Sequence, residues 1–333
     1  MHGVRGWALV VGLGLSAFQS QRAVAKVTFV FTFFDVTTGT GAGFDDPVAG
    51  AARRAALEAT AMAMGERIEQ TATVEVGVAP SEVDGTGPIG IGSATFLDTS
   101  AGIRDGEVYR RIVMGLPDTD PGLDAGIVFD FGYDVALSGT PAAGVAYFPD
   151  VARHELTHAL GFGSFLESDG TGFNGTKPDM YTRFDSLLTT DAGPSAMGLA
   201  VVDVAGNLLL DMATYASAHG SGLVFDGPAS RAANGGAPLK LFGADPTHSA
   251  ASSDVMFPSP AVGTVRDDWT AFDVAALTDL GYTILPPGTG SMGAIMSPAA
   301  CGTCAPAASP FIAFILAGIG GMKRSRRSTR LRQ

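Results

Sequence analysis

The chain has 333 residues, of which 46% are hydrophobic and 16% charged, and its formal net charge at pH 7 is −12. Eight cations and no acid lie in residues 1–25 and 323–333, so the segment between these ends carries a net charge of −20. Such an acidic surface argues against nucleic acid as a partner, because nucleic acids bind basic patches, and it is typical of a soluble extracellular domain.

The first 25 residues have the three parts of a secretory signal. Arg5 precedes an apolar run at residues 7–18, and the Ala-Val-Ala sequence at residues 23–25 is a small-x-small cleavage site. We therefore predict that the protein is exported and that the mature chain begins at Lys26.

Residues 26–163 are predicted to form an N-terminal subdomain with a mixed sheet and helices. The β-branched and aromatic run at 27–33 predicts a first strand, and the run at 48–70, rich in Ala, Met, Glu and Arg, predicts a long helix. Further strands are expected at residues 71–79, 92–97, 107–114 and 125–137.

The most informative motif is His-Glu-Leu-Thr-His at residues 154–158, in a chain that has only 5 His. Apolar residues at helical spacing around the motif predict a helix, which Gly161 ends. On that helix His154 and His158 lie one turn apart on one face, where both can bind one zinc ion, and Glu155 lies beside the water that the ion activates. The motif predicts a zinc peptidase centre, and a surface helix with inert histidines is the alternative.

A catalytic zinc site needs a third protein ligand and an open position for water. In the mature chain only His219 and His248 remain as histidine candidates, and Asp179 is a carboxylate alternative. His248 also has a second interpretation, as a loop histidine that is hydrogen-bonded to Asp245 or Asp254. The residues alone leave these alternatives open.

His248 stands eight residues before Met256, which lies in a tight apolar turn. Together with His-Glu-x-x-His-x-x-Gly-Phe at residues 154–162, this pattern resembles the leishmanolysin-like branch of the metzincin zinc peptidases, including its bacterial secreted members. In that branch a third His and a Met-turn beneath the zinc follow a long insertion. The resemblance implies one catalytic site: the Zn2+ ligands His154, His158 and His248, the general base Glu155 and the Met-turn residue Met256.

The resemblance also implies an α+β fold of the zincin or metzincin kind, in which a loop-rich C-terminal subdomain (residues 164–285) follows the zinc helix. The chain departs from the family in two ways. First, 90 residues separate His158 from His248, which is a long gap for this branch. Second, residues 26–300 contain no cysteine, whereas eukaryotic leishmanolysins commonly have a series of them. The compact metzincin pattern is not met either, because Ser164 occupies the position of its third His.

Three helices are expected in the C-terminal subdomain, around residues 181–188, 208–218 and 269–280. Asp267, Asp268 and Thr270 can cap the start of the last helix, and Gly281 can end it. Residues 269–282 also resemble the helix that closes metzincin catalytic domains.

The predicted reaction is hydrolysis of a peptide bond in a protein or peptide substrate. Glu155 takes a proton from water and passes it to the departing amine. We expect the substrate to lie antiparallel to an edge strand within residues 107–137, upstream of the zinc helix. Three side chains are candidate donors to the anionic intermediate: Tyr181, Tyr215 and Tyr282.

Two acidic loops, at residues 118–124 and 169–179, contain the carboxylates and glycines that a Ca2+ site needs. Solvated loops without an ion are the alternative. We therefore keep Ca2+ as a second candidate cofactor beside Zn2+.

The end of the chain carries a second targeting device. A linker with a Cys-Gly-Thr-Cys motif (residues 286–304) precedes an apolar run (residues 305–322) and a basic tail (residues 323–333). The apolar run is long enough to cross a bilayer, with the cations on the cytoplasmic side. This tail resembles the bacterial C-terminal sorting signals of the Myxo-CTERM type, which implies removal by a sorting protease, and a plain membrane anchor is the alternative.

Taken as a whole, the sequence predicts a zinc endopeptidase that a bacterium exports to its surface or to the medium. One alternative is a surface binding or adhesion protein of weak catalytic activity on a metzincin fold. Another is a metal-dependent hydrolase that acts on a non-peptide amide, because fold analogy alone does not select the substrate.

Overall fold

The structure is a computed structural model that describes residues 26–287, except residues 36–38, 40, 81–82, 118–121, 194–195 and 244. The predicted signal, the linker beyond residue 287, the apolar run and the basic tail lie outside the described residues. Within the described part of the chain, no helix combines the length and the apolar character that crossing a membrane requires.

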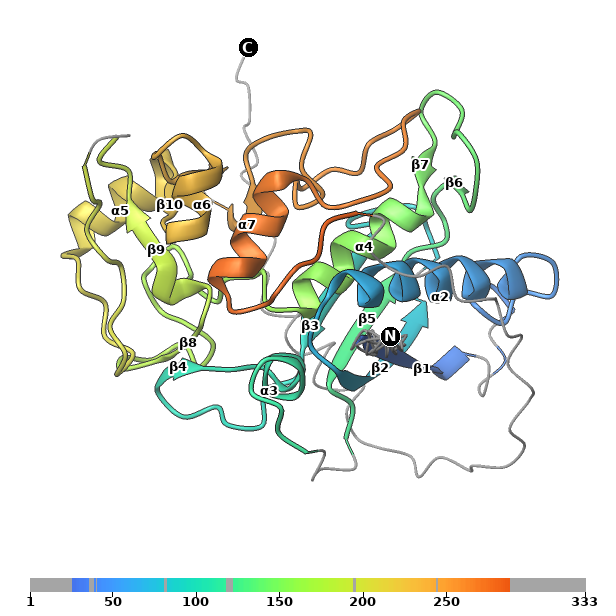
Figure 1. Ribbon diagram of the computed structural model, residues 1–333, viewed down its shortest axis with the longest axis horizontal. Coiled ribbons are helices and arrows are strands. Elements are labelled where there is room, and N and C mark those ends of the chain that lie inside the picture. The colour runs from blue at the N-terminus through green and yellow to red at the C-terminus, as the bar shows by residue number, and fades with distance from the viewer. Residues whose placement is uncertain are drawn as a thin grey trace, which may run out of the picture.

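A mixed four-stranded sheet forms the first half of the molecule, as the sequence predicts (Figure 1). Its strands, in spatial order, are β1 (Val27–Phe33), β2 (Ala72–Pro80), β5 (Ala125–Phe129) and β3 (Gly90–Ala94). β1, β2 and β5 are parallel, whereas β3 is antiparallel to β5 and lies at the edge of the sheet. The free side of β3 is therefore one of the two open edges of the sheet.

Two long helices pack on this sheet and on each other: α2 (Gly50–Arg67) and α4 (Phe148–Ala159). Alternate side chains of β2, Val74, Val76 and Val78, have no exposed surface, as expected for one face of a strand beneath a covering layer. Before α4, two short strands pair with each other, β6 (Val135–Ala136) and β7 (Ala146–Tyr147). From β7, α4 runs towards the half of the molecule that holds β9 and β10 (Figure 1).

One predicted strand of the first half is wrong. Residues 107–114 instead begin with helix α3 (Glu107–Ile112), which contacts β2. Val108, Arg111 and Ile112 are buried at helical spacing, and the Arg111 guanidinium pairs with the Asp124 carboxylate at 3.0 Å. One of the three buried positions of this helix holds an arginine. The apolar residues alone therefore do not show the helical repeat.

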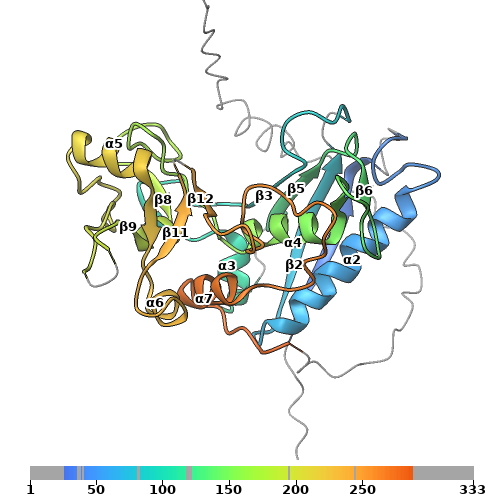
Figure 2. The ribbon, with the colours of Figure 1, turned by 90° about the horizontal axis from the view of Figure 1, so that it is seen from above.

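The second half contains a four-stranded sheet in the order β12-β11-β10-β9, in which each neighbouring pair is antiparallel. Figure 2 shows β11 and β12 on the side of α4 that faces away from α2. The strands are β9 (Leu188–Thr190), β10 (Leu223–Phe225), β11 (Leu239–Phe242) and β12 (Asp245–Ser249). A separate parallel pair, β4 (Gly102–Arg104) and β8 (Met180–Thr182), joins the two halves.

The predicted helix at residues 181–188 is wrong. That segment forms the end of β8, a 3-10 turn (Asp185–Leu187) and the start of β9. The Asp185 carboxylate is fully buried and accepts hydrogen bonds from the backbone N–H groups of Phe165 and Thr182. A carboxylate that holds two separate loops together competes with helical hydrogen bonding of its own segment.

The other predicted helices are present with shifted ends. α5 (Met212–Ser221) begins where the Asp211 side chain accepts from the N–H groups of two following residues. α7 (Ala271–Asp279) begins with a capping box between Thr270 and Asp273 and is followed by Gly281 at φ +108°. A short helix that the sequence did not suggest, α6 (Pro228–Ala233), packs against α7.

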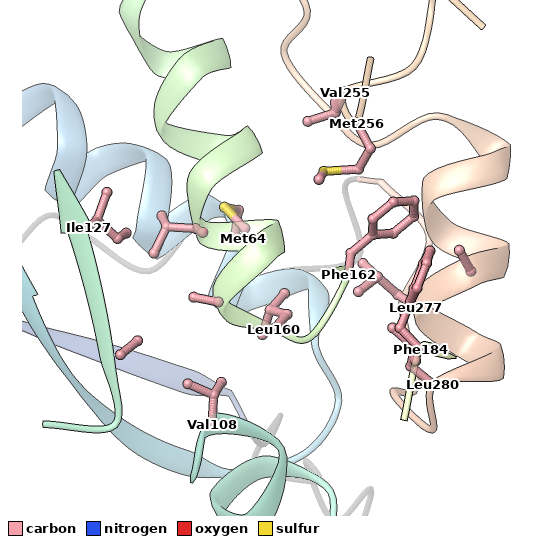
Figure 3. Packing of buried hydrophobic residues seen from close by; sticks show 14 of the residues in the cluster. Met64, Val108, Ile127, Leu160, Phe162, Phe184, Val255, Met256, Leu277 and Leu280 are labelled. Carbon is pink, nitrogen blue, oxygen red and sulfur yellow. The ribbon is translucent and has the colours of Figure 1, made fainter. Parts of the chain in front are cut away.

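The buried side chains of both halves belong to one hydrophobic cluster. Figure 3 shows part of it: Met64 of α2 and Leu160 lie beside α4, while Phe162, Met256 and Leu277 lie between α4 and α7. The fold is therefore α+β, as predicted, with α4 at the centre of a shared core. The subdomain boundary after residue 163 stays a prediction.

Candidate metal centre

Helix α4 places the first two histidines. It begins with a proline in its first turn, which needs no N–H partner there, and with the acidic Asp150. It ends before Gly161, whose φ of +102° would strain any side chain. The rings of His154 and His158 lie on one face with their centroids 4.7 Å apart, as their spacing predicts.

Strand β12 brings a third histidine to the same point. The His248 ring lies 5.2 Å from the His154 ring and 5.1 Å from the His158 ring, measured between centroids. One nitrogen from each of the three rings lies within 4.8 Å of the others, and this is the single group of its kind among the described residues. The arrangement can hold a metal ion.

The two competing candidates for a third ligand lie elsewhere. The Asp179 carboxylate is fully buried and accepts from the backbone N–H groups of Gly172, Asn174, Thr176 and Met180 at 2.7–3.0 Å. The His219 ring packs against Tyr215 in a tilted arrangement, with ring centroids 5.5 Å apart, and is hydrogen-bonded to the backbone of Leu166. Both side chains therefore organise loops of the second half.

The hydrogen bonds of the two helical histidines fix which ring nitrogen is free. Nδ1 of His154 lies 2.7 Å from the Val255 carbonyl oxygen, and Nδ1 of His158 lies 2.6 Å from the Phe162 carbonyl oxygen. A carbonyl oxygen only accepts, so both Nδ1 atoms carry the proton and both Nε2 atoms present a lone pair. The two Nε2 atoms are 3.1 Å apart. Converging lone pairs with no proton between them fit a cation between the rings.

The two interpretations of His248, as a metal ligand and as a histidine that is hydrogen-bonded to an aspartate, do not exclude each other. Its Nδ1 lies 2.8 Å from the Asp245 carboxylate, while the other candidate, Asp254, accepts from the Ser249 hydroxyl. Burial raises the pKa of Asp245, but hydrogen bonds and charge from His248, together with hydrogen bonds from Thr247, outweigh burial and hold this pKa below its ordinary value. A carboxylate on the outer nitrogen orients an imidazole towards a metal, so the hydrogen bond to Asp245 supports ligation.

Burial keeps the helical imidazoles neutral. It lowers the pKa of His154 to about 3, with a further contribution from the neighbouring His248. It also lowers the pKa of His158 well below its ordinary value, and the other two histidines add to this effect. Both rings therefore keep their lone pairs throughout the physiological pH range, which metal binding requires.

Glu155 lies under the edge of the first sheet. Burial raises the pKa of its carboxyl group to about 8, although a hydrogen bond from the backbone of Gly92 opposes the shift. A side chain on Gly92 would place its Cβ 2.2 Å from the Glu155 carbonyl oxygen, and one on Gly90 would lie 2.6 Å from a carboxyl oxygen. Glycine at position 92 lets β3 rest directly on the backbone of α4, and glycine at position 90 leaves room for the Glu155 carboxyl group.

Among the described residues of the range 107–137, where the substrate-binding edge strand is expected, only the two-residue strand β6 has an unpaired side, so that location stays a prediction. Within that range β5 is paired on both sides, with β2 and with β3, and α3 is a helix. The open edge beside α4 belongs to β3, whose Gly-Ile-Gly-Ser-Ala sequence has few residues of high strand propensity. The alternating glycines Gly90 and Gly92 are the feature of the sequence that marks a strand packed closely on other backbone.

Met256 is fully buried, below the chain segment that carries Val255. Its N–H donates to the Asp273 carboxylate at 3.3 Å, and its carbonyl accepts from the Ser249 N–H at 2.7 Å. In Figure 3 the Met256 side chain lies above Phe162 and beside α4. The turn therefore contacts both α4 and the strand of the third histidine.

The three tyrosines proposed as donors to an oxyanion serve other partners. Each is at most 1% exposed and its hydroxyl donates to a backbone carbonyl: Tyr181 to Gly170, Tyr215 to Glu167 and Tyr282 to Leu160. These hydroxyls hold loops against the core, so the prediction of an oxyanion donor among them is wrong.

The acidic loops that suggested Ca2+ are held by internal hydrogen bonds where the structure describes them. Asp169 accepts from Thr171, and Asp124 pairs with Arg111, while residues 118–121 lie outside the described residues. Calcium binding stays a prediction.

Comparisons with known protein families, with curated proteins and with solved structures find no match to this chain. The resemblance to the leishmanolysin-like metzincins therefore rests on the motif residues and on their placement.

Proposed function

We propose that the protein is a zinc-dependent endopeptidase of metzincin type. The observation that carries the proposal is the convergence of His154, His158 and His248, which come from a helix and from a strand 90 residues later. Three neutral imidazoles are the ligand set of a zinc site that keeps one position open for chemistry. Met256, buried next to this site, corresponds to the Met-turn.

The proposed zinc ion, when bound, polarises the scissile carbonyl and acidifies a water molecule. In this proposal the Glu155 carboxylate accepts a proton from water, and the resulting carboxylic acid donates it to the departing amine. This role needs an ionised carboxylate at the start of the cycle. Burial, partly opposed by the hydrogen bond from Gly92, raises the pKa of Glu155 to about 8, and a nearby divalent cation favours ionisation.

The free edge of β3 favours a peptide substrate over a small amide. An extended peptide can pair with unpaired backbone groups of an edge strand, which recognises backbone before side chains. β3 lies against Glu155, so a peptide on this edge passes the proton-transfer group. The polypeptide backbone is the proposed recognition element.

We further propose that the enzyme is exported and reaches the bacterial surface or the medium. Support comes from the signal-like residues 1–25 and from the sorting-signal-like tail, both outside the described residues. A sorting protease is then the partner that processes the tail.

The test measures zinc content and hydrolysis of an unfolded protein by the purified chain. The variants are His248→Ala and Glu155→Gln, and the matched control is His219→Ala, a histidine outside the cluster. We expect about one zinc per chain in the wild type, the control and Glu155→Gln, weakened binding in His248→Ala, and activity only in the wild type and the control. Full zinc binding and activity in His248→Ala contradicts this ligand set, and a wild type without zinc favours the binding-protein alternative.

A further inference from the structure

The turn at residues 254–256, here called the ligand turn, is hydrogen-bonded to both elements that carry the three histidines, α4 and β12. The Val255 carbonyl accepts from Nδ1 of His154 at 2.7 Å. The Met256 carbonyl accepts from the N–H of Ser249, the residue after the third histidine, at 2.7 Å. The position of the ligand turn therefore sets how the helix and β12 present their imidazoles to one another.

Arg266 ties the ligand turn to the first turn of α4. Its Nε and Nη2 atoms lie 2.9 Å and 2.7 Å from one carboxylate oxygen of Asp150. Its Nη1 atom donates to the Asp254 carbonyl, the first carbonyl of the ligand turn. A second hydrogen bond links the same two segments: Nη1 of Arg153, the residue before the first histidine, donates to the Arg266 carbonyl at 2.7 Å.

The chemistry of this contact requires an arginine. The Asp150 side chain is 1% exposed and that of Arg266 is 12% exposed, so the pair is shielded from water. A guanidinium presents donors in a rigid fork and can serve the carboxylate and the carbonyl together. A lysine ammonium is a compact charge on a flexible stem and reproduces the charge without the fork.

We propose that Arg266 is a positioning residue of the metal centre. It fixes the distance between α4 and the ligand turn, and through the Val255 carbonyl it holds the His154 ring at the metal. This inference rests on the proposed function, because it concerns the ligand geometry of the same site. Partners that orient ligands in this indirect way typically change metal affinity by about 10–100-fold when they are removed.

Arg231 offers a matched control elsewhere in the molecule. Its guanidinium pairs with the carboxylate of Asp226, whose side chain is 3% exposed, with Nη2 at 2.8 Å. It also donates to the carbonyls of Gly236 at 2.8 Å and Ala196 at 3.1 Å. Arg231 therefore makes the same kinds of bonds as Arg266, but its partners belong neither to the ligand turn nor to α4.

The experiment compares Arg266→Gln, Arg266→Lys and Arg231→Gln with the wild type in the purified full chain. It measures Zn2+ affinity by competition with a chelator, the absorption bands of the Co2+ form, and the Tm of the metal-free form. We expect Arg266→Gln to weaken Zn2+ binding about tenfold or more and to change the Co2+ bands. Arg266→Lys restores part of the affinity, and Arg231→Gln lowers the Tm with an affinity within about twofold of the wild type.

Equal metal affinity in Arg266→Gln and Arg231→Gln overturns the proposal, because Arg266 is then an ordinary ion pair. If Arg266→Gln does not fold, Asp150→Ala removes the same link from the α4 side and is expected to weaken metal binding in the same way. Its failure to do so overturns the proposal as well. A wild type that binds Zn2+ but hydrolyses no peptide contradicts the proposed function and leaves the affinity test of Arg266 valid. A wild type that binds no metal overturns both.

Discussion

Glu155 bears the proton transfer of the proposed reaction, so its replacement separates metal binding from catalysis. In Glu155→Gln the three imidazoles are unchanged, and the amide fits the space of the carboxyl group under β3. We expect zinc affinity close to that of the wild type and a kcat at least about 100-fold lower, the usual loss for a missing general base. Parallel measurement of zinc content and of kcat on one peptide tests this, and retained activity contradicts the role of Glu155.

His219 predicts a dependence of stability on pH. Burial lowers its pKa below the ordinary 6.5, although a hydrogen bond to the Leu166 backbone opposes the shift. Below pH 6.5 the unfolded chain therefore binds more protons than the folded chain, so stability is lost as the pH falls towards the lowered pKa.

The variant His219→Gln keeps a donor for the Leu166 carbonyl and removes this titration. We expect its free energy of unfolding to fall less than that of the wild type between about pH 7 and pH 5. Urea unfolding of the metal-free proteins at several pH values measures the difference. Identical pH slopes show that His219 has the same pKa in both states.

At the scale of single residues, the candidate site was predicted from the spacing of residues along the chain. The spacing of His154 and His158 places both rings on one face of any helix, and the buried Met256 eight residues after His248 marks the turn beside them. The partners of the rings were not predicted, apart from Asp245, because the bonds of Val255 and Phe162 use backbone carbonyls. Every residue has such a carbonyl, so no side chain signals which one will accept.

Strand β3 depends on its glycines more than on its strand propensity. A Cβ on Gly92 would lie 2.2 Å from the Glu155 carbonyl oxygen and 2.8 Å from the carbonyl carbon, and both are backbone atoms of α4. Gly92→Ala must therefore push β3 away from the helix. We expect a loss of about 1–3 kcal/mol in the free energy of unfolding, the usual cost of overpacking, and reduced hydrolysis.

Gly220→Ala in α5 is the matched control for this prediction. A Cβ at Gly220 meets nothing within 4 Å, and alanine is favoured over glycine within a helix by about 0.5–1 kcal/mol. This variant should be at least as stable as the wild type in urea unfolding. A Gly92→Ala protein as stable as Gly220→Ala would mean that β3 does not rest on α4.

The elements that the sequence predicted well are those with a strong local signal. β1, β2, α2 and α7 have clear apolar patterns or caps and lie close to their expected bounds. Helix α3 and the segment around Asp185 were mistaken because a buried charged group completes their structure. Arg111 occupies a core position only because Asp124 pairs with it, and a pairing of that kind depends on tertiary contacts.

At the scale of the whole molecule, the proposed centre joins two parts of the fold. His154 and His158 belong to α4, which packs on the first sheet, whereas His248 belongs to the edge of the second sheet. The segment between His158 and His248, residues 159–247, contributes β8 to β11 and two helices, α5 and α6. No local sequence pattern predicts the length of the segment between the second and the third histidine. Three candidates for the third ligand therefore remained until the structure showed where the strands lie.

A metal ion that is bound by α4 and by the second sheet should stabilise both parts of the fold together. Ligand binding to the folded state adds about 4 kcal/mol to the free energy of unfolding at a free metal concentration about 1,000 times the Kd. We expect Zn2+ to raise the Tm of the wild type and of His219→Ala, and a chelator to reverse the rise. In His248→Ala the metal is held from α4 alone, so the same Zn2+ concentration should give a much smaller rise. An equal rise in His248→Ala would place the third ligand elsewhere and would separate the second sheet from the metal centre.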